Sequence, residues 1–325
     1  MPSTPEGKSL LRNIHLGKGE GWALAAALGY ALYQVFLGAA MRGEVHNMVG
    51  ATVQAIPLLL FATSMGWVIN RRGKETTSIF GDWRLIGALV TNGLLLFVVA
   101  TPLLFESLRK GGVLITSPVA GTQVLFAALL AAILLREPFT RTMALGMGIS
   151  VAGVLVLTIG RSGAELPSTW WLAVPFALGT ALSWALAGVL MTYTMRRGVD
   201  PFQAVAFPTI VGVLTLNGYL LATGQTGVYG GTSTGTYMIL LSAGVFTATA
   251  LICLTLALNL TTVASATTLN SLQVAIAPVI AWIFLGEDPN LAAAVGILTI
   301  LVGVIVVQRG KLAAQKRLGE WSMMR

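Results

Sequence analysis

The chain has 325 residues, of which 55% are hydrophobic and only 10% are charged, against about 25% charged residues in soluble domains. Together with a mean hydropathy of +0.81, this composition excludes a water-soluble globular enzyme. The net charge of +8 would suit a nucleic-acid-binding protein only if Lys and Arg were clustered on one folded face, but they lie in loops and tails. No nucleic-acid partner is therefore expected.

Residues 1–20 are interpreted as a cytoplasmic N-terminal tail. They carry Lys8, Arg12 and Lys18 between apolar residues, and the first apolar run after them is too long for a cleavable signal peptide. The tail is expected either to lie on the membrane surface or to be disordered.

Ten apolar runs follow, and each is long enough to cross a bilayer as a helix. Five of them make up the segment 21–160 and cover residues 21–40, 49–69, 85–105, 112–135 and 142–160. Five more make up the segment 170–307 and cover residues 170–195, 201–222, 236–258, 262–285 and 291–307. Residues 308–325 are interpreted as a cytoplasmic C-terminal tail. The expected fold class is an all-α integral membrane protein with ten transmembrane helices. Helices seven to nine have the least defined bounds, because no charged residue separates them.

The distribution of Lys and Arg tests this helix number, because cytoplasmic loops carry the excess of positive charge. With both chain ends in the cytoplasm, sixteen of the 20 Lys and Arg residues fall on the cytoplasmic side. The other four are Arg42, Arg109, Lys110 and Arg161. A miscounted helix would scramble this partition. The distribution therefore predicts a multi-pass protein of the bacterial inner (plasma) membrane, with the N- and C-termini cytoplasmic.

The second half of the chain repeats the first at a constant offset of 150 residues. Gln123 meets Gln273 and Glu137 meets Glu287 at this offset. Other matches are Ala27–Gly29 with Ala177–Gly179, Gly38 with Gly188, Gly146 with Gly296 and Gly153 with Gly303. Matched Gly, Gln and Glu without a gap indicate a tandem duplication. Because each repeat has an odd number of helices, the second would enter the membrane from the opposite face, an inverted arrangement typical of alternating-access carriers.

Three short motifs resemble those of a known family. They are FLGE at Phe284–Glu287, its counterpart LLREP at Leu134–Pro138, and ALSW at Ala181–Trp184. Placed within the repeat, they are similar to EamA-type members of the drug/metabolite transporter superfamily. The resemblance spans helices one to ten and implies a carrier, usually an exporter of amino acids or other metabolites, with a central cavity between the halves. One departure is Gln34, which stands where family members often have the tryptophan that matches Trp184.

No ionisable residue lies near the middle of any predicted helix, where such groups are costly and usually functional. Glu106 precedes Arg109 by three residues, which predicts an interfacial ion pair. Glu137 and Glu287 lie just beyond helix ends, where a loop-structuring role is expected. His46, at the non-cytoplasmic edge of helix two, is interpreted as an interfacial polar residue.

Catalytic and cofactor motifs are missing from the sequence. The single cysteine, Cys253, excludes an intramolecular disulfide and a cysteine-based metal cluster. There is no His-Glu-x-x-His motif and no Gly-rich phosphate loop. The sequence therefore predicts no enzyme, no cofactor and no bound metal, and facilitated diffusion or exchange is the simplest mechanism.

Polar and aromatic residues near the midpoints of their helices are the candidate substrate-binding residues, because transporter sites usually lie at the bilayer midplane. They are Tyr30, Tyr33, Gln34, Gln54, Asn92, Gln123, Ser183, Trp184, Thr247, Asn270 and Gln273. The alternative role for the Gln and Asn residues is hydrogen bonding between helices. An amide-lined cavity without fixed charge suits a neutral or zwitterionic solute, and aromatic walls favour hydrophobic or aromatic amino acids.

Glycines and prolines inside the helices suggest where the bundle packs and bends. Gly29, Gly38 and their repeat partners are expected to allow close helix approach. Pro57 and Pro208 interrupt helices two and seven at near-equivalent places and are candidate hinges, because each removes a backbone hydrogen bond.

Three other functions remain open from the sequence. The first is a carrier of drugs, nucleotide precursors or sugars, although the missing central Lys or Arg disfavours phosphorylated anions. A membrane-embedded enzyme acting on lipid is the second, and a channel is the third. A small-molecule substrate and membrane lipid are the expected partners, and the oligomeric state stays open.

Overall fold

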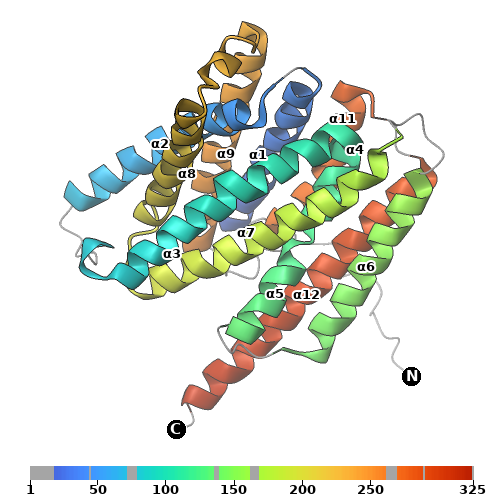
Figure 1. Cartoon of the computed structure of the whole chain (residues 1–325). Helices are drawn as coiled ribbons and strands as arrows, with labels where there is room; N and C mark the ends of the chain where they lie inside the picture. Colours follow the sequence, from blue (N-terminus) through green and yellow to red (C-terminus); the bar gives the residue numbers. More distant parts are fainter. Residues whose placement is uncertain are drawn as a thin grey trace, which may run out of the picture.

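The computed structural model describes residues 18–43, 45–71, 79–134, 139–161, 168–260, 269–287 and 290–323. These residues are helical almost throughout, and none of them is in a β-strand. The first half contains α1 (Lys18–Met41), α2 (Asn47–Arg71), η1 (Ile79–Gly81), α3 (Trp83–Gly93), η2 (Leu94–Ala100), α4 (Thr101–Gly121), α5 (Gln123–Leu134) and α6 (Arg141–Arg161). The second half contains η3 (Trp170–Leu172), α7 (Ala173–Arg196), α8 (Gln203–Ala222), η4 (Thr226–Tyr229), α9 (Thr234–Leu260), α11 (Gln273–Leu285) and α12 (Leu291–Met323) (Figure 1).

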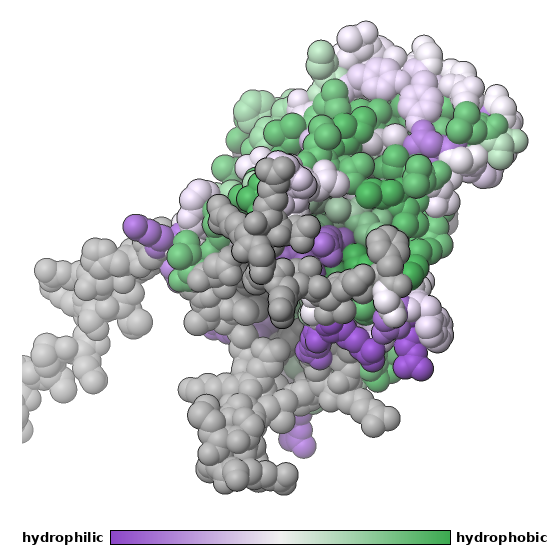
Figure 2. Space-filling view, turned by 90° about the vertical axis from the view of Figure 1, so that its left-hand side faces the viewer, coloured by the Kyte–Doolittle hydropathy of each residue, from purple (hydrophilic) through white to green (hydrophobic). Residues whose placement is uncertain are grey.

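Seven helical stretches among the described residues are long and apolar enough to cross a membrane. They are Lys18–Met41, Asn47–Val68, Trp83–Leu134, Trp170–Arg196, Gln203–Ala222, Thr234–Ala257 and Leu291–Gly310. Large apolar side chains such as Ile159, Phe284 and Leu291 are more than 70% exposed. In Figure 2 hydrophobic residues occupy the middle of one face, and the strongly hydrophilic residues gather below and beside them. This is the surface of a protein whose solvent is largely hydrocarbon.

The 52-residue stretch Trp83–Leu134 is broken at Gly112, the first residue of the predicted fourth helix. Gly112 has φ 67° and ψ −173°, outside the helical region. Ser107 Oγ and Thr116 Oγ1 lie 2.7 Å apart across the break. Nine residues of straight helix would separate them by about 13 Å, so the chain folds back at Gly112.

Before this break, the helix widens at η2, a π-helical segment that joins α3 to α4. Pro102 is the second residue after this segment, and a proline ring clashes with the carbonyl four residues earlier in a regular helix. The wider turn accommodates the ring, and the Thr101 hydroxyl donates to the Leu96 carbonyl at 2.8 Å. The helix therefore bends here but continues as far as Gly111.

The principal helix contacts join the first half of the chain to the second. The α1 helix packs on α9, and α7, its counterpart at an offset of 150, packs on α3, η2 and α4. The α2 helix packs on α8, α4 packs on α11, and α6 packs on α12. In Figure 1, α6 and α12 lie side by side along one edge, and α2 and α8 lie at the opposite edge. The two halves thus share one core.

Glycines bring α6 and α12 into backbone contact. A Cβ at Gly146 would lie 2.7 Å from the Gly303 carbonyl oxygen, and a Cβ at Gly153 would lie 2.6 Å from the Ile300 nitrogen. The repeat partners Gly296 and Gly303 face α6 at similarly short range. Close helix approach, expected for Gly29, Gly38 and their repeat partners, is found at Gly29, Gly38 and Gly179, which touch Ala250, Val113 and Leu103. The prediction was wrong for Gly188, where a Cβ meets no described atom within 4 Å.

Several helices differ from their predicted bounds. The α12 helix continues sixteen residues beyond Val307, to Met323, through the segment that was predicted to be a C-terminal tail. At 1.5 Å per residue its length is about 50 Å, more than the bilayer core of about 30 Å. The predicted ninth helix, 262–285, begins within the range 261–268, which lies outside the described residues, and so does Glu137 after the fourth helix.

Candidate functional site

Two helices are interrupted just before the matched residues Gln123 and Gln273. The α4 helix ends at Gly121, Thr122 forms a turn with ψ −3°, and α5 begins at Gln123. At the equivalent place, residues 271–272 form a turn before α11 begins at Gln273. In both turns a backbone N–H donates to a carbonyl only three residues earlier, from Thr122 to Val119 and from residue 272 to residue 269. The sequence shows no sign of these interruptions, because no charged residue or Gly-Pro pair marks them.

The two interruptions lie where α4 crosses α11. A Cβ at Gly121 would lie 2.3 Å from Val274 Cγ2, and Val124 packs in the same apolar cluster as Val274. Gln123 and Gln273 are both half-buried. The crossing therefore brings together two helix N-termini, one from each half, and each begins with a glutamine.

A second polar group lies where α9 packs on α1 and α2. Two close approaches fix the register: Gly29 of α1 touches Ala250, and Gly244 of α9 lies against the Gln54 carbonyl of α2. Gln34, Gln54 and Thr247 therefore come from neighbouring turns of three packed helices. The Gln54 side chain lies beside the Tyr33 hydroxyl. Tyr30 lies beside both Tyr33 and Cys253 of α9.

Three acceptors in this second group are buried and have no hydrogen-bond partner among the described residues. They are Gln34 Oε1, Gln54 Oε1 and Thr247 Oγ1. Thr249 and Thr255 on the same helix donate to the carbonyl four residues earlier, as helical threonines commonly do, but Thr247 makes no such bond. Buried polar atoms without partners are uncommon, and they mark places where a ligand or water can bind.

The α7 helix contributes Ser183 and Trp184. Trp184 is half-buried and packs against both large apolar clusters, so it lies between the α1–α2–α9 region and the α4–α11 crossing. The Ser183 hydroxyl donates to the Gly179 carbonyl of the same helix at 2.8 Å, so its proton is not available to another acceptor. Trp184 thus joins the two apolar regions, and Ser183 offers only its acceptor lone pairs.

Asn92 and Asn270 stand apart from the other candidates. Asn92 Nδ2 donates to the Ala187 carbonyl at 3.0 Å, an interhelical bond between α3 and α7, while its Oδ1 has no partner in the described parts of the chain. Leu269, the neighbour of Asn270, packs with Ala23 and Ala257 near the start of α1. Asn270 therefore lies about 15 Å along α1 from Gln34, instead of at the shared depth that the sequence predicted.

The candidate hinge prolines each touch a glycine from the other half. A Cβ at Gly93 of α3 would lie 2.4 Å from the Pro208 carbonyl oxygen, and a Cβ at Gly244 of α9 would lie 2.9 Å from the Pro57 ring. These contacts are equivalent at an offset of 151, one residue more than in the rest of the repeat. Both prolines therefore sit at a close, glycine-mediated contact between the halves.

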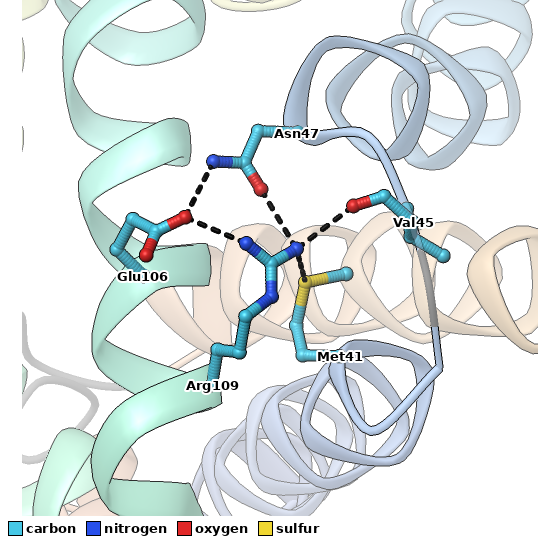
Figure 3. A network of polar contacts seen from close by, with 5 residues as sticks. All are labelled: Met41, Val45, Asn47, Glu106 and Arg109. Carbon is cyan, nitrogen blue, oxygen red and sulfur yellow. Dashed lines mark hydrogen bonds and ion pairs between the residues drawn. The ribbon is translucent and has the colours of Figure 1, made fainter. Parts of the chain in front are cut away.

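Arg109 ties the α1–α2 connection to α4 (Figure 3). Its guanidinium donates to Glu106 Oε1 at 2.6 Å, so the predicted ion pair is confirmed. It also donates to the Val45 carbonyl at 2.8 Å and to Asn47 Oδ1 at 3.1 Å, and Asn47 Nδ2 donates to Glu106. A cavity of about 290 Å³ beside this network is lined by Val45, His46, Asn47, Met48, Pro102 and Arg109.

The same end of the bundle is closed by the connection between α8 and α9. The Tyr229 hydroxyl donates to Asn217 Oδ1, and Asn217 Nδ2 donates to Thr52 Oγ1 of α2 at 3.2 Å. The Tyr237 hydroxyl donates to the Tyr229 carbonyl at 2.7 Å. Thr236 lies beside Gly43 of the α1–α2 connection. Sequence reasoning did not identify these residues, because tyrosine and asparagine near helix ends have no distinctive pattern.

Two further features were not expected from the sequence. The Ser117 side chain is fully buried on α4, and its Oγ has no partner within the described ranges. The Glu287 carboxylate accepts the backbone N–H groups of Val113 and Leu114, so it structures the start of another helix. Among the described residues, no three His, Cys, Asp or Glu side chains are close enough together to hold a metal ion.

Comparison with solved structures places the fold among known ones. One solved chain, described only as "Crystal structure of protein", matches with a TM-score of 0.61 and 16% identity, over 89% of this chain and 97% of that chain. At this identity the likeness concerns the fold alone. The curated proteins gave no match.

The family comparison matches each half of the chain separately. The model of the EamA-like transporter family matches residues 17–159 and again residues 171–309. The first match covers α1 to α5 and almost all of α6, and the second covers α7, α8, α9, α11 and the first part of α12, so the two matches follow the sequence repeat. The chain is therefore a multi-pass membrane protein that belongs to the EamA-like transporter family.

Proposed function

We propose that this protein is a carrier of small neutral or zwitterionic solutes, most specifically hydrophobic or aromatic amino acids, in the bacterial inner membrane. Membership of a transporter family gives the general function. The observation that carries the finer proposal is the pair of interrupted helices at the α4–α11 crossing, where Gln123 and Gln273 begin α5 and α11. Discontinuous helices at the centre of a repeat interface are the usual substrate sites of secondary transporters.

Ten membrane crossings follow if the broken and short helices are counted as spans. The stretch Trp83–Leu134 folds back at Gly112 and supplies two crossings instead of one. The shorter apolar helices Arg141–Leu157 and Gln273–Leu285 supply two more. Each half then has five crossings, so the halves are inverted. The Lys and Arg distribution supports a cytoplasmic location for both termini.

The polar groups at the α4–α11 crossing and at the contact of α1, α2 and α9 match the two ends of an amino acid. Helix N-termini carry partial positive charge, so the starts of α5 and α11 favour a carboxylate. The unpartnered oxygens of Gln34 and Gln54 are acceptors and favour an ammonium group. Gln273 follows Asn270 by three residues and is therefore about 10 Å along α1 from Gln34, so a zwitterion would meet the two kinds of group in succession, without a fixed counter-charge.

Tyr30 and Trp184 supply the apolar part of the site. Both are half-buried, and Trp184 touches both apolar clusters. An aromatic pair is worth about 0.5–1.5 kcal/mol beyond the area that it buries. The proposed preference for hydrophobic and aromatic side chains depends on these two residues.

Alternating access is the proposed mechanism, and the shared core suggests how it proceeds. Because equivalent helices make equivalent contacts across the halves, the bundle can exchange the conformations of its two halves and open to the opposite side. The contacts of Pro57 with Gly244 and of Pro208 with Gly93 are the places where α2 and α8 would pivot.

Uptake of radiolabelled Phe, Trp, Leu and Thr into sealed proteoliposomes tests this proposal. We expect saturable uptake of Phe, Trp and Leu without a pH gradient, and an approximately tenfold loss for Trp184→Ala. Trp83→Ala is the matched control, because Trp83 is 77% exposed and should leave uptake unchanged. No amino-acid uptake by folded protein, with uptake of a drug, nucleotide precursor or sugar instead, would overturn the substrate assignment. Equal losses for the two tryptophan variants would overturn the site.

A further inference from the structure

The Glu287 carboxylate lies at a junction of three helices. It follows α11 and accepts the backbone N–H of Val113 at 3.1 Å on Oε1 and that of Leu114 at 2.7 Å on Oε2. Arg42, just beyond α1, places Nη2 3.5 Å from Oε1. The Glu287 side chain is only 11% exposed. A carboxylate from the second half therefore caps a helix of the first half.

Two glycines in left-handed conformations shape this contact. Gly286 ends α11 with φ 64°, which turns the chain so that Glu287 leaves the helix axis. Gly112 opens the second part of α4 with φ 67°, and a Cβ there would lie 2.6 Å from Glu287 Oε1. The carboxylate thus occupies the space that any other residue at position 112 would need for its side chain.

The cap also holds apolar packing in place beneath it. Val113 is fully buried, and its Cγ2 fills the space above Gly38 near the end of α1. Leu285, two residues before Glu287, packs 3.5 Å from the same glycine position. The ends of α1 and α11 and the start of the second part of α4 are therefore pinned together at one level, beside the network of Arg109.

We propose that Glu287 is the latch of the non-cytoplasmic gate: its carboxylate holds α4 against α11 when that side is closed, and the bond breaks when the side opens. The proposal rests on the carrier function and orientation given above. It assigns to the FLGE segment at Phe284–Glu287 a role in the conformational cycle. Arg42 reinforces the latch from α1.

The latch favours the closed state because its donors lose their acceptor on opening. Two helix N-terminal N–H groups and the helix dipole stabilise the carboxylate in the closed state. When α11 moves away, water must replace all of these interactions. Hydrogen bonds to a charged group are about twice as strong as neutral ones, so Glu287 biases the gate more than an amide at the same position would.

Cysteine accessibility tests the latch without knowledge of the substrate. In a Cys253→Ala background, Val113→Cys places the only thiol directly under the cap, and its reaction with a charged maleimide is followed in purified protein. We expect slow labelling with Glu287 present. Labelling should be about tenfold faster in Glu287→Gln and in Gly112→Ala, since the loss of a charge-assisted bond shifts an equilibrium by about that factor. Gly148→Ala is the control, because a Cβ there meets no described atom within 4 Å.

A crosslink gives an independent measurement at the same place. A Cβ at position 38 would lie 3.8 Å from the Val113 Cβ, which is the usual separation in a disulfide. Gly38→Cys with Val113→Cys should therefore crosslink on mild oxidation. The yield should fall when Glu287→Gln is added. Because this pair does not depend on a stable Gly112 variant, it keeps the test valid if that variant misfolds.

The latch and the carrier function fail in different ways. If neither Glu287→Gln nor Gly112→Ala changes the labelling rate, and Glu287→Gln does not lower the crosslinking yield, the latch is overturned, even if uptake is normal. Labelling that depends on Glu287 in a protein that takes up no amino acid would support the latch and overturn the proposed amino-acid substrate.

Discussion

Replacing Gly93 by alanine tests the close contact between α3 and α8. The new Cβ would lie 2.4 Å from the Pro208 carbonyl oxygen and 3.1 Å from its carbonyl carbon and Cα. A carbon–oxygen contact normally needs about 3.3 Å or more, so the helices must separate by close to 1 Å. The atoms on the other side of the contact are backbone, which cannot move aside as a flexible side chain would. Overpacking of this kind costs about 1–3 kcal/mol.

The assay is thermal unfolding in detergent with Gly87→Ala as the reference. Gly87 lies on the same helix, and a Cβ there meets no described atom within 4 Å. Alanine is favoured over glycine in a helix by roughly 1 kcal/mol, so Gly87→Ala should be neutral or stabilising. Gly93→Ala should unfold several degrees lower. Equal melting temperatures for the two variants would refute the close contact between Gly93 and Pro208.

Three other perturbations follow from the packing. Arg109→Ala should destabilise the protein by about 1 kcal/mol in thermal unfolding, because it removes the donor to the Val45 carbonyl. The ion pair with Glu106 adds little, since both side chains are about one-third exposed. An unchanged melting temperature would argue against this role of Arg109. Pro57→Ala and Pro208→Ala should slow uptake more than they weaken substrate binding, and equal effects would remove the hinge role. Gly303→Val should cost about 1–3 kcal/mol, measured by unfolding, since its Cβ would meet Ser150 Oγ at 2.2 Å; wild-type stability would contradict the contact.

The all-helical fold and its repetition were predictable from the sequence, because apolar composition and self-similarity can both be read along the chain. Apolar runs set the spans, and the break at Gly112 falls at the predicted start of a helix. The pair of Glu106 and Arg109 was predictable because three residues along a helix place side chains on one face. These features need no knowledge of tertiary structure.

Features that depend on contacts between halves were not predictable. The turns before Gln123 and Gln273 lie within uncharged sequence, and a largely apolar helix in lipid has no charged face to reveal its register. Asn270 was placed at the depth of Gln34 by counting from a helix start that lies outside the described residues. Glu287 was predicted to structure its own loop, but the N–H groups it accepts are more than 170 residues away in sequence.

The shared core has a consequence for biogenesis. When the first half has left the ribosome, α1 and α6 have not yet met α9 and α12, their main partners. Gly146 and Gly153 would then face lipid, which fills their grooves poorly. A half-length chain should therefore be a substrate for membrane proteases. Co-expression of residues 1–166 and 167–325 as separate chains should rescue both from degradation, because each fragment supplies the surface that the other lacks.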